Sequence, residues 1–295
     1  SNVGTYTKAV GISDAVMGTG LASNYEFHYT EGNLVITPRP VDIKVINTTK
    51  FYGDANPTTT AIVEEAGKGT GLLNGDTLTD ITTIYDSSIN EKTHASTTPY
   101  DGIIRSEGGT FTGSSKENYT FNYGKGNILV RPLPITVTSD NAVKTYGSTT
   151  PITAAAKITS GSLVNGDALD SVTVTTNATE TSPVGDGYTT TPSGLTLKAG
   201  GNGAASDYAV TYDSGSLKVM PRPVYLIEDN KTRIYGEENS TAVYQNSKEN
   251  TNHFTVAATD QDANTGLVNG DTIAKVTTEG NLMDTSITSA SNVGT

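Results

Sequence analysis

The sequence has no cysteine and no tryptophan, and it has only three histidines among its 295 residues. A chain without cysteine forms no disulfide and has no thiol nucleophile, so each folded unit must be stabilised by its own packed core. His28, His94 and His253 lie far apart in the sequence, which argues against a histidine-based metal cluster. We therefore predict no metal site and no catalytic residues.

Basic residues are also scarce, since 19 Lys and Arg stand against 31 Asp and Glu, for a net charge of −12. Nucleic acids and anionic membrane surfaces bind basic patches, so neither is a predicted partner. No apolar run approaches the roughly 18 residues that a membrane span needs. The sequence contains no phosphate-binding loop, Gly-x-Ser-x-Gly elbow or dinucleotide fingerprint. We predict a protein that is not an enzyme, binds no cofactor and does not insert into membranes.

The sequence is rich in threonine and contains 15 tyrosines and 31 glycines, a composition typical of strands and turns. Three short markers recur in a fixed order, which indicates tandem repeats. The first marker is Tyr-Gly with Lys or Arg two positions before the tyrosine. The second is Asn-Gly-Asp, and the third is a Tyr-x-(Phe/Val)-x-Tyr segment. The Tyr-Gly marker occurs at Tyr52 and Gly53, Tyr146 and Gly147, and Tyr235 and Gly236. The Asn-Gly-Asp marker occurs at Asn74, Gly75 and Asp76, at Asn165, Gly166 and Asp167, and at Asn269, Gly270 and Asp271. The third marker begins at Tyr25, Tyr119 and Tyr208.

The spacing of the markers predicts the domain organisation. The Tyr-Gly markers and the third markers are each 94 and then 89 residues apart, close to the size of one small domain. We predict a complete first repeat at 40–133 and a complete second repeat at 134–222. Residues 1–39 are predicted to be the C-terminal part of a repeat, and residues 223–295 the N-terminal part of another, each completed by a neighbouring segment.

Each repeat is predicted to be a β-domain. Val41, Ile43 and Val45 alternate with polar residues, as in a strand with one buried face. The Tyr-x-(Phe/Val)-x-Tyr segment is predicted to close each repeat as a hairpin. We predict an all-β fold of tandem antiparallel, Ig-like β-sandwiches, joined by proline-rich connectors into an elongated rod. The alternative is a β-grasp-like module with one short helix near the Asn-Gly-Asp marker.

Two markers have a structural and a functional interpretation. Asn-Gly-Asp favours a tight turn, because Asn and Gly tolerate a positive φ. The alternative is a Ca²⁺ site at Asp76, Asp167 and Asp271, although a calcium loop supplies several oxygen ligands in close sequence. The recurring tyrosines are expected to fill the core, and the alternative is an exposed aromatic stripe that stacks on glycans.

The order of markers resembles the MBG/YDG-type repeats of large bacterial surface proteins. The resemblance rests on Lys-x-Tyr-Gly, Leu-Val-Asn-Gly-Asp, Asn-Tyr and Gly-x-Leu-x-Val-x-Pro, and it covers the whole chain. It implies a stalk or filament segment of an extracellular adhesin or filamentous-haemagglutinin-like protein at the bacterial cell surface, with neighbouring modules or further copies of the protein as head-to-tail partners. The alternative function is a ligand-binding adhesin module that uses variable loops or exposed tyrosines to bind a host glycan or protein.

Overall fold

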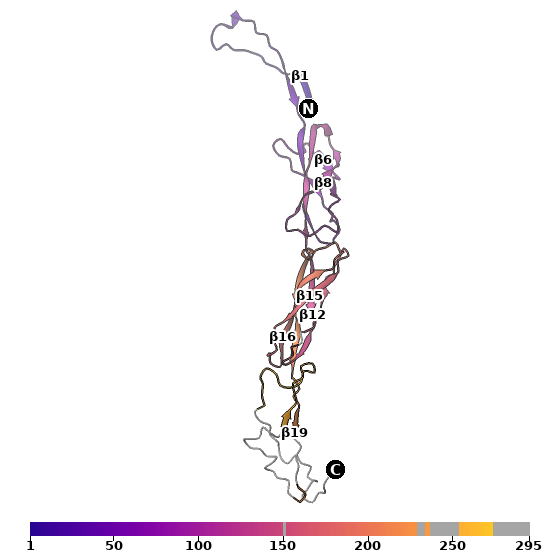
Figure 1. Ribbon diagram of the computed structural model, residues 1–295. Coiled ribbons are helices and arrows are strands. Elements are labelled where there is room, and N and C mark those ends of the chain that lie inside the picture. The colour runs from indigo at the N-terminus through magenta and orange to yellow at the C-terminus, as the bar shows by residue number, and fades with distance from the viewer. Residues whose placement is uncertain (150–151, 229–233, 237–253, 274–295) are drawn as a thin grey trace. The chain divides into compact units, whose positions relative to one another are not determined.

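The computed structural model describes residues 1–149, 152–228, 234–236 and 254–273 (Figure 1). Its chain forms two compact units. The first unit consists of Ser1–Pro134 together with Ser162–Leu169 and Leu197–Ala209. The second unit consists of Ile135–Gly161, Asp170–Thr196 and Val210–Thr295. Two segments of the second repeat therefore belong to the same compact unit as the whole first repeat.

The described residues are almost entirely strands and loops, which confirms the prediction of an all-β fold. The N-terminal segment and the first repeat contain β1 (Gly4–Val10), β2 (Gly32–Ile36), β3 (Arg39–Val45), β4 (Thr48–Phe51), β5 (Ala61–Val63), β6 (Thr77–Thr79), β7 (Thr82–Tyr85), β8 (Tyr100–Glu107), β9 (Thr110–Thr112), β10 (Tyr119–Tyr123) and β11 (Lys125–Arg131). The rest of the chain contains β12 (Leu133–Ser139), β13 (Ala142–Thr145), β14 (Ala156–Ser160), β15 (Leu169–Thr176), β16 (Gly185–Leu197), β17 (Tyr208–Asp213), β18 (Gly215–Met220), β19 (Leu226–Glu228) and β20 (Phe254–Val256). The described helices are three-residue 3-10 turns at Ala22–Asn24, Lys116–Asn118 and Ala205–Asp207.

Both whole repeats have the same sheet topology. The first repeat has sheets in the order β10-β3-β5 and β4-β11-β8-β7, and the second has β17-β12-β14 and β13-β18-β16-β15. The register agrees too, because Thr48 pairs with Ile128 in the first repeat and Ala142 pairs with Leu217 in the second. The periodicity of the sequence therefore corresponds to a repeated tertiary structure.

The strand pairing corrects the predicted closing hairpin. Strand β10 pairs with β3 in parallel, whereas β11 pairs with β4 and β8, so the two strands belong to different sheets. The backbone crosses between the sheets at Gly124, whose N–H donates to the Ile43 carbonyl at 2.8 Å. A Cβ on Gly124 would lie 2.5 Å from that oxygen, so only glycine allows the close approach. The segment joins the two sheets and is not a hairpin.

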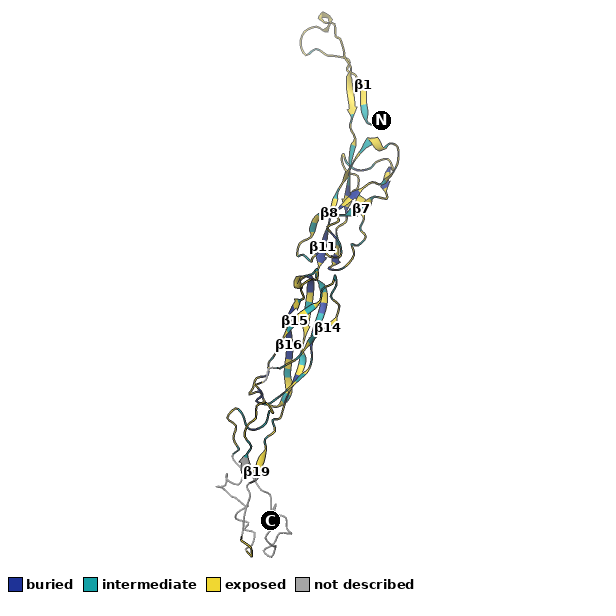
Figure 2. Ribbon diagram, turned by 45° about the vertical axis from the view of Figure 1, so that its right-hand side comes forward, coloured by how far each residue is buried: buried dark blue, intermediate teal, exposed yellow. Residues whose placement is uncertain are grey.

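Each repeat has a small core between its two sheets. Val41, Ile43 and Val45 are at most 2% exposed, which confirms the predicted alternation. One cluster joins Val45 to Ile89, Ile104 and Ile128, and a second joins Ala178, Leu217 and Val219. Figure 2 shows buried residues along β11, whereas β1 is mostly exposed. The strands around these cores lead into the turns that contain the Tyr-Gly and Asn-Gly-Asp markers.

Candidate functional site

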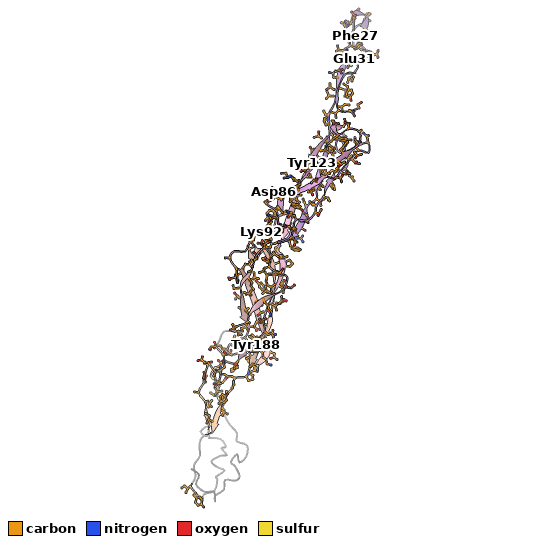
Figure 3. The ribbon with its side chains drawn as sticks, turned by 90° about the vertical axis from the view of Figure 1, so that its right-hand side faces the viewer. Phe27, Glu31, Asp86, Lys92, Tyr123 and Tyr188 are labelled. Carbon is orange, nitrogen blue, oxygen red and sulfur yellow. The ribbon has the colours of Figure 1, made fainter. Side chains whose placement is uncertain are left out.

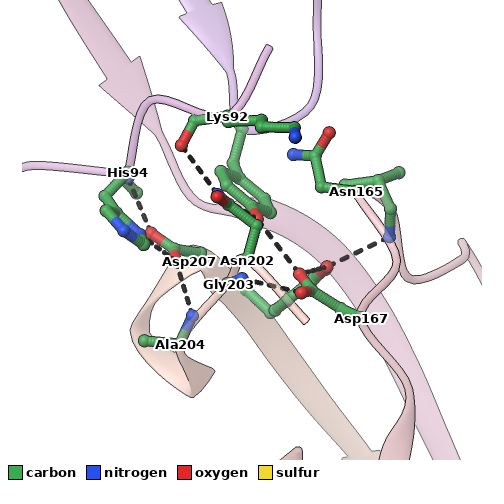
Figure 4. Close-up of polar contacts among 12 residues, drawn as sticks. Lys92, His94, Asn165, Asp167, Asn202, Gly203, Ala204 and Asp207 are labelled. Carbon is green, nitrogen blue, oxygen red and sulfur yellow. Dashed lines mark hydrogen bonds and ion pairs between the residues drawn. The ribbon is translucent and has the colours of Figure 1, made fainter. Parts of the chain in front are cut away.

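Three marker residues meet in the first unit, although the sequence separates them widely. The Tyr52 hydroxyl donates a hydrogen bond to Asp167 Oδ2 at 3.1 Å, and the Tyr208 hydroxyl donates to the same oxygen at 2.6 Å. The Gly203 N–H donates to Oδ1 at 2.7 Å, so both carboxylate oxygens are engaged (Figure 4). We call the set of Tyr52, Asp167 and Tyr208 the tyrosine–aspartate junction. It links the first repeat to the two segments of the second repeat within this unit.

The Asn-Gly-Asp marker forms the predicted turn. Asn165 and Gly166 have φ values of 55° and 81°, and the Asp167 N–H donates to the Val164 carbonyl at 2.9 Å. Two successive positive φ angles are the geometry of a type I′ turn, which Asn-Gly favours. The turn places the Asp167 carboxylate and the Asn165 amide on the surface that the Tyr-Gly loop contacts.

The Tyr-Gly loop lies against this turn. Gly53 has a positive φ of 90°, and a Cβ there would lie 2.6 Å from a Val164 methyl group. The Gly53 N–H and the Asn165 side-chain amide both donate to the Glu91 carbonyl, at 3.1 and 2.8 Å. Glycine is thus required by conformation and by the contact with Val164.

A buried lysine, which the sequence analysis did not identify as functional, fixes the Tyr-Gly loop. Lys50 is 6% exposed, and its ammonium donates to the Asp54 and Asn90 carbonyls and to Asn56 Oδ1 at 2.6–3.0 Å. Burial lowers the pKa of Lys50, while the nearby Glu91 and Asp54 carboxylates oppose that shift. The basic residue of the marker therefore holds the loop from inside the repeat.

Asp207 forms a second contact between the same segments. Its buried carboxylate accepts hydrogen bonds from His94 Nδ1 at 2.7 Å, the Ala95 N–H at 2.7 Å and the Ala204 N–H at 2.8 Å (Figure 4). Asn118 holds the same repeat position, and its Oδ1 accepts the Val3 N–H at 2.9 Å. The sequence did carry a signal for these residues, because Asn or Asp precedes the tyrosine in all three third markers.

The second unit repeats the junction with different residues. The Tyr146 hydroxyl donates to Asp271 Oδ2 at 3.1 Å, and the Asn269 amide donates to the Glu180 carbonyl at 3.3 Å. Gly147 has a φ of 69°, and a Cβ there would collide with Val268. Two independent copies of the same contact indicate that the markers encode the docking of one repeat onto the next.

Two of the proline-rich connectors also carry an arginine, and its side chain contacts a nearby loop. Arg39 donates to the carbonyls of Gly67, Thr70 and Gly71 at 2.6–2.9 Å. Arg222 makes the same kind of contact with the Asp260, Thr265 and Gly266 carbonyls at 3.0–3.1 Å. Each arginine therefore fixes the loop that leads into an Asn-Gly-Asp turn. The second repeat has Leu133 at this position, so its turn is held without an arginine.

The hydrogen bonds shift the ionisation of the junction. Burial acts to raise the pKa of Asp167, but donation from Tyr208, Gly203 and Tyr52 outweighs it and lowers the pKa. Donation from Tyr119 is the main reason that the pKa of Asp76 is lowered. Burial, followed by the bond to Asp167, raises the pKa of Tyr208. The stable form of the junction has an ionised aspartate and neutral tyrosines.

This ionisation predicts acid sensitivity. A carboxylate with a lowered folded-state pKa stabilises the protein above its unfolded-state pKa of about 3.9, and that stabilisation is lost as the pH falls through the folded-state value. We expect the midpoint of thermal unfolding to change little from pH 7 to pH 5 and to fall below about pH 4. The Asp167→Asn variant should lose less on acidification than the parent. An equal loss in both proteins would show that Asp167 does not contribute to the acid transition.

The residues of the two functional alternatives, the Ca²⁺ site and the exposed aromatic stripe, lie in different environments. The Asp167 carboxylate is occupied by protein donors, and no group of three or more His, Cys, Asp or Glu suited to a metal ion occurs in the described part of the chain. Tyr208 is buried and Tyr119 is half-buried, in line with a structural role. Tyr25, Phe27 and Tyr29 are 61%, 39% and 44% exposed and lie between β1 and β2, where Figure 3 labels Phe27.

Comparisons with known proteins agree with the repeat structure. The family model described as MBG domain (YGX type) matches residues 41–129 and again residues 135–218. The two matches cover more than half of the chain, and each includes one Tyr-Gly marker and one Asn-Gly-Asp marker. A search of curated proteins gave no significant match. Among the described residues, no helix is long and apolar enough to cross a membrane.

Proposed function

Because the chain belongs to the MBG domain (YGX type) family, whose members are repeat modules of extracellular surface proteins, we propose that it is a stalk segment of a bacterial cell-surface adhesin or fibre. This family is not an enzyme family, and the proposed role involves no catalysis and no cofactor. The function then lies in the length and stiffness that docked repeats provide.

The observation that carries this proposal is the recurrence of the tyrosine–aspartate contact in both units. A tandem array joined only by flexible linkers needs no buried side chains between successive repeats. Here Tyr52 is fully buried, and a glycine is required where the next turn packs onto it. Stability in repeat arrays is the sum of the repeats and of the contacts between neighbours, so such docking favours a stiff stalk.

The exposed aromatic side chains of the N-terminal segment favour the second candidate, a ligand-binding adhesin module. However, Tyr25 occupies the repeat position of Tyr119 and Tyr208, which are half-buried and buried. Both whole repeats therefore use this position for packing. This comparison supports the stalk over a glycan-binding stripe.

Small-angle X-ray scattering of the chain tests the proposal. A compact domain of 295 residues has a radius of gyration of about 19 Å. Repeats docked end to end should give a value well above this, and a Tyr52→Phe, Asp167→Ala variant should show a broader distribution of distances. A value close to that of a compact domain would contradict the stalk. Saturable binding on a glycan array, abolished by Tyr25→Ala, would support the adhesin module.

A further inference from the structure

The first and last strands of the first repeat lie side by side along their length. Strands β3 and β4 begin the repeat and β10 and β11 end it, and β10 pairs with β3 and β11 with β4, both in parallel. The register is the same in both pairings, because each paired residue lies opposite the one 80 positions later, from Arg39 and Tyr119 to Phe51 and Arg131. The two pairings therefore form one parallel ladder that continues from one sheet into the other.

Hydrogen bonds continue across the point where the ladder changes sheets. The Gly124 N–H donates to the Ile43 carbonyl at 2.8 Å, and the Asn127 N–H donates to Asn47 Oδ1 at 2.8 Å. Asn47 and Asn127 are themselves 80 positions apart, so this bond keeps the register of the ladder. A side-chain carbonyl thus supplies the acceptor between the two stretches of paired backbone.

The second repeat has the same arrangement. Strand β13 pairs with β18 in parallel over four residues, beginning at Ala142 and Leu217. Asn141 Oδ1 accepts the Ser216 N–H at 2.8 Å, as Asn47 Oδ1 accepts a backbone N–H in the first repeat. The parallel pairing of an early strand with the last strand is therefore a property of the repeat.

The direction of this pairing decides how a repeat responds to tension. In an array, tension enters a repeat at the start of its first strand and leaves at the end of its last strand. Because the two strands are parallel, these two points lie at opposite ends of the ladder. The force then slides one strand along the other, and the hydrogen bonds of the ladder resist it together. An antiparallel pair loaded at its open end, such as β7 and β8, opens instead one bond at a time.

We propose that this ladder is a tension-bearing clamp, and that each whole repeat resists a force that pulls its two ends apart. The inference rests on the proposed stalk function and specifies the load that the stalk carries. The clamp also holds the docking loop, because the Tyr52 N–H donates to the Arg131 carbonyl at 2.9 Å, next to the last pair of the ladder. Docking gives the stalk stiffness, and the clamp keeps each repeat folded under tension.

Two proline substitutions in β4 test the hydrogen bonds of the clamp. Since the Tyr52 N–H points toward β11 and N–H directions alternate along a strand, the Thr48 N–H points toward β11 and the Thr49 N–H away from it. In a chain pulled from the two ends of the repeat, Thr48→Pro should shorten the lifetime at constant force by about tenfold. Thr49→Pro is the matched control and should change it by less than about twofold, because β4 is an edge strand and proline is tolerated where the N–H faces outward. Equal effects of the two prolines would contradict the clamp.

Single-molecule force spectroscopy of the full chain tests the clamp without altering the ladder. The natural chain has no cysteine, so a pair of introduced cysteines fixes where the force is applied. Thr37→Cys with Pro134→Cys places the two handles at opposite ends of the ladder. Thr37→Cys with Glu117→Cys places them at the same end, so that the pairs open one after another from Arg39 and Tyr119. All three substituted positions are exposed, and both pairs of handles unfold the first repeat.

At the same constant force, the repeat should survive at least about tenfold longer with the handles at opposite ends than with the handles at the same end. Forced unfolding is governed by the unfolding rate, and sliding the strands breaks several hydrogen bonds at once before the barrier is crossed. Equal lifetimes in the two geometries would overturn the clamp and leave the scattering test of the stalk unaffected. A compact chain in scattering, together with the expected difference in lifetime, would contradict the stalk and leave the clamp.

Discussion

Replacement of Asp207 by alanine is expected to lower the free energy of unfolding of the first unit by about 3–4 kcal/mol. The Asp207 carboxylate is fully buried and accepts three hydrogen bonds, two of them from the Ala95 and Ala204 N–H groups. Alanine would leave these backbone donors without their acceptor, and water cannot replace it without opening the contact. Urea unfolding followed by tyrosine fluorescence measures the loss.

Two further variants identify the origin of this loss. Asp207→Asn keeps one carbonyl oxygen as an acceptor and should cost roughly half as much as alanine. Asp213→Ala removes an exposed carboxylate six residues further along the chain and should change the free energy of unfolding by less than about 0.5 kcal/mol. If Asp207→Ala were as mild as Asp213→Ala, the buried network would not contribute to stability.

Local structure was predictable from the sequence where backbone chemistry alone decides it. Asn74, Asn165 and Asn269 all have the positive φ expected of an Asn-Gly turn, and so do the glycines that follow them. The alternation from Val41 to Val45 identified a buried strand face. These features depend on a few neighbouring residues, so a short motif is sufficient to indicate them.

Features that depend on long-range pairing were not predictable in the same way. The segments around Gly124 resemble a hairpin, because a turn separates two alternating strands. The strands pair instead with β3 and β4, about 80 residues away, and no local signal distinguishes the two arrangements. The role of Asp207 was also missed, since its partner His94 lies 113 residues away in the sequence.

The markers recur together in the sequence, and the contacts between them give the reason. A tyrosine in one repeat and an aspartate in the next form a single hydrogen bond, and the glycine after the tyrosine makes space for the hydrophobic residue three positions before the aspartate. A change in any one of them would disturb a contact with a neighbouring repeat. The sequence period therefore encodes docking as well as folding.

Replacement of Asp167 by alanine is the second change with a large expected effect. It removes the acceptor for Tyr52, Tyr208 and Gly203, and we expect a loss of about 2–3 kcal/mol in the free energy of unfolding. The loss should be smaller than for Asp207→Ala, because Asp167 is only half-buried and water can reach the freed groups. An exposed carboxylate in the same segment of sequence, Asp170, provides a matched Asp→Ala control.

A double-mutant cycle between Tyr52 and Asp167 tests most directly whether the repeats are held together by this junction. It needs the free energies of unfolding of the parent, Tyr52→Phe, Asp167→Ala and the double variant. Each substitution removes the same hydrogen bond, so the double variant should be more stable than additivity predicts, by about 1–2 kcal/mol. A coupling energy below about 0.3 kcal/mol would contradict the account, because the two residues would then stabilise the protein independently.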